Sequence, residues 1–259
     1  MTTARCAVTL LALCVAAPAV PARAADLEVL SAGALEAGLP EIIGAFGRST
    51  GHNIRLDITT PPVIRRRLAA GETVDVVIVP PVVLDDPAIS GRIDGKSRRT
   101  IGRAGVGIAV HVDAPAPAIT TRDEVRAALL AAASVVYNTA STGTYFVKLI
   151  DQLGIADAVK AKATIYGSGQ EVMAHIARGQ NPRGELGIGP LTEIHLYVRK
   201  GVRLVGPLPP EIQNYTSYVA VVMTDSKAPA AAAAFVAALR SPQAQAAFKA
   251  TGLEIIAQD

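Results

Sequence analysis

The sequence has no tryptophan, and aromatic residues make up only 4% of its 259 residues. Proteins that bind single-stranded nucleic acid commonly stack the bases on aromatic side chains, so this composition argues against such a platform and against a similar one for sugars. The charge is also nearly balanced, with 25 Lys and Arg against 22 Asp and Glu. Without a strong positive excess there is no electrostatic case for a nucleic-acid partner.

Cysteine is scarce as well, since Cys6 and Cys14 are the only two in the sequence. Both lie in a segment where Arg5 precedes an apolar run and Ala22, Arg23 and Ala24 form an A-x-A cleavage pattern. We therefore predict a signal peptide over residues 1–24 that is removed on export to the periplasm. The alternative is a retained anchor, although the run is short for a bilayer. The remaining chain would have no disulfide, thiol nucleophile or thiolate metal site.

Short apolar stretches alternate with segments of helical periodicity along the rest of the chain. This pattern predicts an α/β fold with mostly parallel sheets. Ligands of such sheets bind beyond the carboxyl ends of the strands. We expect a polar connector at residues 92–99. The expected strands are residues 27–30, 52–58, 74–79, 104–112, 133–136, 163–166, 184–188, 202–205 and 218–223.

Five strand-to-helix turns share one chemistry, because all are small, neutral and rich in hydrogen-bond donors. The N–H groups of a first helical turn lack internal partners, and the helix dipole adds positive charge there, so an anion can bind. None of the five turns contains a carboxylate, histidine or lysine in a catalytic arrangement. The alternative for the third turn is that Ser141 or Thr142 merely caps its helix. The turns are residues 31–34, 59–60, 138–144, 167–169 and 189–190.

Other catalytic or metal-binding patterns are weak. The four histidines have no zinc-ligand spacing, and no G-x-S-x-G nucleophile motif occurs. We therefore expect a protein that is not an enzyme, with no cofactor and no side-chain metal ligand. Arg65 and Arg66 could bind a carboxylate or phosphonate, since arginine binds such groups bidentately. The alternative is that residues 65–67 form a solvated helix face.

Five segments carry a pattern in their order along the chain: residues 30–35, 41–51, 71–78, 166–179 and 239–245. Together they resemble segments of the periplasmic molybdate-binding proteins of ABC importers and their wider family of solute-binding proteins. The resemblance implies a periplasmic binding protein-like fold of two α/β lobes that close on a small anion by a hinge motion. It also implies a monomer that delivers its ligand to an ABC permease.

The resemblance further implies where the lobes divide. We expect lobe 1 to comprise residues 25–105 and 220–259, and lobe 2 residues 106–219. The crossing strands would lie near residues 104–112 and 218–223.

The ligand-binding residues that the resemblance implies come from four loops. They are Gly33, Ala34, Thr59, Thr60, Ser141, Thr142, Gly143 and Val172. Two positions depart from the molybdate pattern, because the family has serine at position 34 and a tyrosine hydroxyl at position 190, where this chain has Ala34 and Pro190. Residues that could replace the missing donors are Ser31, Tyr145 and Ser168.

The two missing donors affect the expected ligand. A charge-assisted hydrogen bond contributes roughly 1.5–3 kcal/mol, so losing two would weaken molybdate binding by on the order of 100-fold or more. A molybdate-like oxyanion is the first expectation. The alternatives are a small carboxylate or phosphonate bound with Arg65 or Arg66, or a surface or signalling relative that does not serve a transporter.

Overall fold

The computed structural model describes residues 24–181 and 184–256, in which nine strands form one mixed sheet. The strand order is β2-β1-β3-β9-β4-β7-β5-β6, with β8 paired to β4. The strands are β1 (Asp26–Ala32), β2 (Asn53–Thr59), β3 (Val76–Val79), β4 (Ile93–His111), β5 (Ser134–Asn138), β6 (Ala163–Tyr166), β7 (Glu185–Pro190), β8 (Val202–Pro207) and β9 (Tyr215–Met223).

Helices follow most of the strands, as the alternating pattern predicts. The longer ones are α1 (Leu39–Thr50), α2 (Pro61–Ala69), α5 (Arg122–Ala131), α6 (Ser141–Gln152), α8 (Gly169–Arg178), α9 (Leu191–Tyr197), α10 (Pro229–Ala238) and α11 (Pro242–Ala250). The shorter ones are α3 (Pro81–Leu84), α4 (Pro87–Ser90), α7 (Ala156–Lys160), η1 (Gly33–Leu35), η2 (Val198–Lys200) and η3 (Pro210–Ile212). No helix of the described residues is long and apolar enough to cross a membrane.

Local sequence explains how several of these helices begin and end. Gly51 ends α1 with a φ of 75°, a left-handed conformation that favours glycine. Capping boxes start α5 and α8, where Thr121 and Ser168 each exchange hydrogen bonds with a glutamate three residues later.

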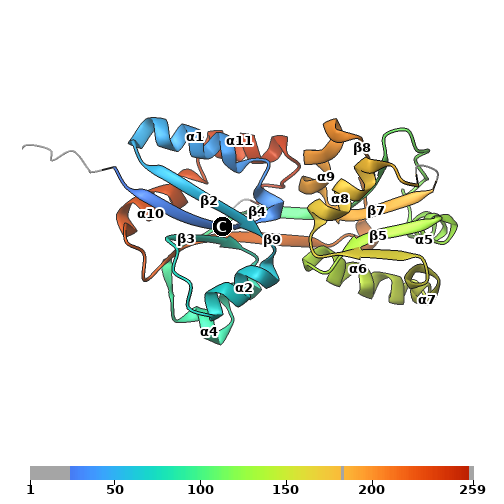
Figure 1. Ribbon diagram of the computed structural model, residues 1–259, viewed down its shortest axis with the longest axis horizontal. Helices are drawn as coiled ribbons and strands as arrows, with labels where there is room; N and C mark the ends of the chain where they lie inside the picture. The colour runs from blue at the N-terminus through green and yellow to red at the C-terminus, as the bar shows by residue number, and fades with distance from the viewer. Residues whose placement is uncertain (1–23, 182–183, 257–259) are drawn as a thin grey trace, which may run out of the picture.

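Figure 1 shows two groups of helices and strands joined by a pair of crossing strands. Each group has its own buried hydrophobic side chains. One core draws on residues 27–104 and 218–253, and we call the part around it lobe 1. Two adjoining clusters draw on residues 106–212, and we call this part lobe 2. β4 and β9 run antiparallel from one lobe to the other, with Thr100 opposite Val219 and Gly105 opposite Tyr215. The exact division expected from the sequence stays a proposal.

The sheet is mixed because of these crossing strands. β1 pairs in parallel with β2 and β3, and β5 with β6 and β7, as the α/β pattern predicts. β4 and β9 add antiparallel pairings. The polar connector expected at residues 92–99 is wrong, because residues 93–99 belong to β4. Pairing with β9 at both ends of the segment, where Ile93 lies opposite Met223 and Arg99 opposite Ala220, supplies hydrogen bonds that hold this polar segment in the strand.

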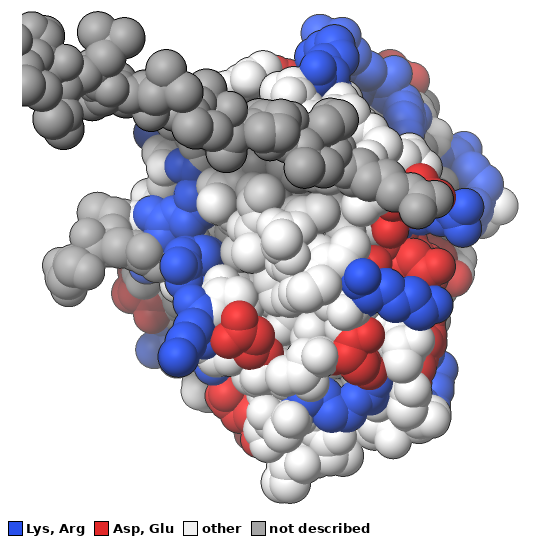
Figure 2. All heavy atoms as spheres, turned by 90° about the vertical axis from the view of Figure 1, so that its left-hand side faces the viewer, with Lys and Arg blue, Asp and Glu red and all other residues white. Residues whose placement is uncertain are grey.

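The end of lobe 1 that points away from lobe 2 has mixed charge. Figure 2 shows mostly uncharged surface in the centre of this face, with Lys and Arg along both its left and right edges and Asp and Glu interspersed among them. Charges of both signs therefore lie on this face.

Candidate functional site

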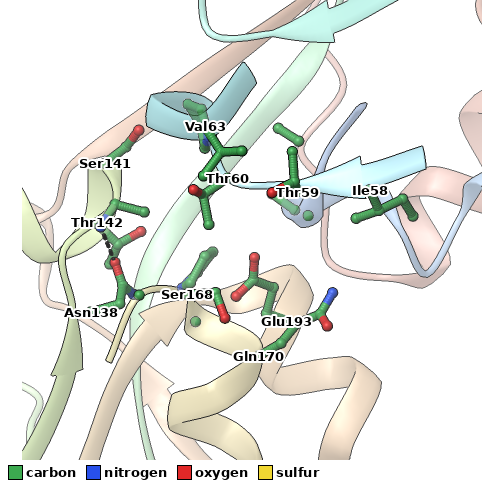
Figure 3. A pocket seen from close by; sticks show the side chains of 18 of the residues that line it. Ile58, Thr59, Thr60, Val63, Asn138, Ser141, Thr142, Ser168, Gln170 and Glu193 are labelled. Atoms are coloured by element: carbon green, nitrogen blue, oxygen red, sulfur yellow. Dashed lines mark hydrogen bonds between the residues drawn. The ribbon is translucent and has the colours of Figure 1, made fainter. Parts of the chain in front are cut away.

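A cavity of about 320 Å³ lies between the two lobes, beside the crossing strand β9. All five donor-rich turns contribute to its wall, as expected for strands whose carboxyl ends meet. In Figure 3, Thr59 and Thr60 of lobe 1 lie opposite Ser168 and Glu193 of lobe 2. Of the residues expected to bind a ligand, eight line the cavity. They are Gly33, Ala34, Thr59, Thr60, Ser141, Thr142, Ser168 and Pro190.

Five other expected residues do not line it. Ser31 is fully buried and its hydroxyl donates to the Ala32 carbonyl. Val172 is buried in a core of lobe 2, and its N–H donates to the Ser168 carbonyl. Gly143 donates its N–H to the Asn138 side chain. Tyr145 donates its hydroxyl to the Ile212 carbonyl. Arg65 lies in a neighbouring groove.

The beginning of α6 is capped from the preceding strand. Asn138 Oδ1 accepts the N–H groups of Ala140, at 2.8 Å, and Gly143, at 3.3 Å. The alternative that Ser141 or Thr142 caps this helix is therefore wrong, since α6 has no side-chain bond at its N-cap residue. None of the hydrogen bonds between described residues uses the N–H of Ser141 or Thr142. These two amides remain free to donate at the cavity wall.

The beginnings of α2 and α8 differ in what they can donate. Pro61 and Pro62 open α2 and have no N–H, so Val63 provides its first backbone donor beside the Thr60 hydroxyl. Ser168, which starts α8, has its N–H and hydroxyl bonded to Glu171 Oε2, each at 2.9 Å. The capping box therefore already uses the donors of Ser168 that were expected to face a ligand.

Glu193 is the residue of this site that the sequence analysis missed. It is the third residue of α9 and is 7% exposed, and its Oε2 has no hydrogen-bond partner among the described residues. A methyl group added to Gly169 would lie 1.9 Å from Oε2, and one added to Gly33 would lie 3.0 Å from Oε1. The two glycines thus make room for this carboxyl group, which reaches the cavity wall.

Burial, together with the negative charge of Glu36, raises the pKa of Glu193 to about 8. The group is therefore mostly protonated at neutral pH and can donate a hydrogen bond. Tyr218 on β9 also lines the cavity, and burial raises the pKa of its hydroxyl. Glu193 and Tyr218 are thus neutral donors in this wall.

A second polar contact joins the lobes next to Glu193. Gln170 of α8 donates its side-chain N–H to the carboxylate of Glu36, which follows η1 in lobe 1. Burial raises the pKa of Glu36, while the charge of Lys200 lowers it. This contact and the Glu193 carboxyl belong to one junction between the lobes.

The charges around the cavity are sparse. Its described lining residues include Glu171 and Glu193 but no lysine, arginine or histidine. Among the described residues no group of three His, Cys, Asp or Glu side chains could hold a metal ion. An adjoining groove of about 1150 Å³ contains Arg65 and Arg66, and Arg65 is paired with Asp86 at 2.5 Å. Arginine is therefore near the cavity without lining it.

The pattern of the bacterial extracellular solute-binding protein family matches residues 27–254. The chain belongs to this family. A relative named aconitate isomerase, from Pseudomonas sp, is 31% identical to this member over 236 residues, which is 88% of this chain and 87% of the relative. The resemblance to the molybdate-binding-protein-like branch of solute-binding proteins is confirmed.

Solved structures support the fold of this solute-binding protein. The periplasmic molybdate-binding protein of Azotobacter vinelandii has a TM-score of 0.68 at 19% identity, covering 90% of this chain and 100% of its own. The sulfate-binding protein SubI of Mycobacterium tuberculosis H37Rv has a TM-score of 0.73 at 18% identity, covering 88% and 86%. The predicted α/β, periplasmic binding protein-like fold is confirmed.

Proposed function

We propose that this solute-binding protein holds a small organic anion with carboxylate groups between its two lobes. The observation that supports this most directly is Glu193, a buried acid with an unpartnered oxygen in a wall of neutral donors. A protonated carboxyl group that donates to a ligand carboxylate forms an O–H···O⁻ bond, which is shorter and stronger than a neutral one. The free amides of Ser141 and Thr142 would bind a second oxygen atom of the ligand.

The size of the cavity favours an organic ligand over a single tetrahedral oxyanion. Its 320 Å³ is about ten times the ~30 Å³ share of one water molecule in the liquid. It also reaches the roughly 300–1,000 Å³ range of small-molecule sites. A tetrahedral oxyanion has five heavy atoms and would leave much of this space to water.

The two departures from the molybdate pattern favour the same choice. Ala34 and Pro190 both line the cavity, and neither side chain has a hydrogen-bond donor. The molybdate-like ligand expected first would therefore lack two of its side-chain donors. For this reason we propose a small organic anion, rather than a molybdate-like oxyanion, as the ligand.

We further propose that the protein acts in the periplasm and delivers its ligand to an ABC permease. The family description supports a location outside the cytoplasm, while the proposed signal peptide lies outside the described residues. A relative that binds a ligand without serving a transporter is the alternative. Permease and ATPase genes beside this one would support transport.

A second candidate function is isomerisation of an unsaturated polycarboxylate, as the name of the 31% identical relative suggests. Glu193 favours this candidate because its pKa of about 8 lies near the range in which a group both takes and returns protons efficiently. Moving a double bond within such an acid removes a proton at one carbon and adds one at another. The expectation that the protein is not an enzyme stays a prediction.

A thermal-shift screen followed by calorimetric titration tests the ligand class. We expect di- and tricarboxylates, including cis- and trans-aconitate, to raise Tm, while molybdate, tungstate, sulfate and phosphate do not. A ligand at 100 times its Kd stabilises the folded state by about 2.7 kcal/mol. A shift with molybdate and none with any carboxylate would contradict the proposal.

A separate assay tests the second candidate. The protein is incubated with trans-aconitate, and the cis isomer is followed by proton NMR with Glu193→Gln as the control. Formation of the cis isomer by the wild type alone would support catalysis. Binding of trans-aconitate without its conversion would contradict the isomerase candidate and would agree with a solute-binding protein.

A further inference from the structure

The Glu193 carboxyl group lies where the two lobes touch. Gly33, on one side of it, belongs to η1 of lobe 1, and Gly169, on the other, begins α8 of lobe 2. Helix α9, which carries Glu193, packs against η1. The contact between the lobes at this point is therefore built around one carboxyl group.

The groups around this carboxyl offer no positive charge in direct contact with it. The neutral Gln170 side chain bridges to Glu36 across the lobes. Lys200 acts on Glu36 and is not among the causes that shift Glu193. Among the described residues, the titratable groups that act on Glu193, are acted on by it or line the cavity with it are Glu36, Glu171, Tyr197 and Tyr218, and Lys200 acts on Glu36.

We propose that closing the two lobes takes up one proton at Glu193, so that protonation of this side chain holds the lobes together and its ionisation separates them. The inference concerns the regulation of the binding site and rests on the proposed function, since it takes the lobes to close around a ligand. It makes the cleft of this solute-binding protein sensitive to pH.

Electrostatics gives the direction of the effect. In the arrangement seen here, an ionised Glu193 would be buried without a hydrogen-bond partner for Oε2 and would face the negative charge of Glu36. Both conditions disfavour the charged form. When the lobes separate, water reaches the carboxyl group, and its pKa returns toward the ordinary value of 4.5.

The pH range follows from these two values. In the arrangement seen here, which we take as the closed form because the lobes touch at Glu193, the pKa of Glu193 is about 8, above the ordinary value of 4.5. Between these limits the closed form holds a proton that the open form lacks. The equilibrium constant for closing therefore falls with rising pH, by up to about tenfold per pH unit, and levels off above the upper limit.

Fluorescence energy transfer in the ligand-free protein tests the inference. Dyes are attached at Glu41→Cys on α1 and Lys160→Cys on α7, two exposed positions in different lobes, in a background in which Cys6 and Cys14 are serine. The closed fraction of the wild type is expected to fall as the pH rises from 5 to 8. Glu193→Gln, which cannot ionise, should stay closed throughout.

Two controls complete the test. Glu211→Gln, at an exposed position away from the cavity, should follow the wild type. Glu36→Gln should lower the pKa of Glu193 in the closed form and thereby end the pH-dependent range at a lower pH. A wild-type closed fraction that does not change with pH, or a Glu193→Gln variant that changes like the wild type, would overturn the proposal. Because no ligand is present, this result is independent of the carboxylate screen.

Discussion

Pro190 and Glu193 occupy the N-cap and third positions of α9, the positions that form a capping box in α5 and α8. In those two helices the glutamate accepts the N–H of the N-cap residue. Proline has no N–H, so Glu193 has no such partner. Its carboxyl group instead reaches the cavity between two glycines. Pro190 therefore has two effects on the site. It lacks the tyrosine hydroxyl expected at this position, and it leaves the Glu193 carboxyl group without a capping partner.

The first prediction concerns the pH dependence of stability. In the folded protein the pKa of Glu193 is raised from 4.5 to about 8. The stability that its protonation contributes is therefore fully present below pH 4.5 and is lost as the pH rises through about 8. We expect the wild-type free energy of unfolding to decrease relative to Glu193→Gln by up to about 1.4 kcal/mol per pH unit in this range. Urea unfolding at pH 5, 6.5 and 8 measures it, and parallel curves would refute it.

The second prediction concerns the space beside Glu193. A methyl group at Gly169 would lie 1.9 Å from the Glu193 Oε2 atom. Gly169→Ala should therefore destabilise the protein by about 1–3 kcal/mol, as overpacking does, and weaken ligand binding. Gly91→Ala is the matched control, because nothing lies within 4 Å of its added methyl group. Equal Tm values for the two variants would show that the carboxyl group moves aside without cost.

The third prediction concerns the amides of α6. Ser141 is the first residue of this helix, where proline is tolerated, and Ala140 before it has an extended conformation. Ser141→Pro removes the N–H and the hydroxyl, whereas Ser141→Ala removes the hydroxyl alone. We expect the proline variant to bind a carboxylate ligand about 10- to 100-fold more weakly than the alanine variant, as the loss of one charge-assisted bond implies. Equal Kd values for the two variants in calorimetry, with unchanged circular dichroism, would show that the Ser141 amide does not bind the ligand.

The fourth prediction separates the cavity from the adjoining groove. Arg65 lies in the groove and is paired with Asp86. Its side chain is largely exposed, so we expect Arg65→Ala to change the Kd of a carboxylate ligand by less than about twofold, as for other weak surface ion pairs. Arg66→Ala should behave in the same way. A tenfold loss of affinity in either variant would indicate that the ligand reaches into the groove. It would then support the arginine contact considered from the sequence.

The sequence allowed the meeting of the five turns to be predicted, because parallel strands direct their carboxyl ends to the same edge. It could not show which donors stay free. The N–H of Gly143 is used by Asn138, and that of Val172 by the preceding turn, through contacts that depend on the folded backbone.

Glu193 was missed for a different reason. It lies three residues beyond its turn, in a position where a glutamate ordinarily caps a helix. The signal that could have found it is the proline at the N-cap, which rules out that ordinary role.

The crossing of β4 and β9 has a mechanical consequence. The lobes are joined by a hydrogen-bonded ribbon rather than by two independent loops, and its register is irregular between Asp94 and Arg99 and between Thr100 and Gly102. A paired ribbon resists stretching and sliding of one strand past the other, but it bends and twists where its pairing is interrupted. These interruptions lie on the lobe 1 side of the crossing, so we expect relative motion of the lobes to bend the ribbon there.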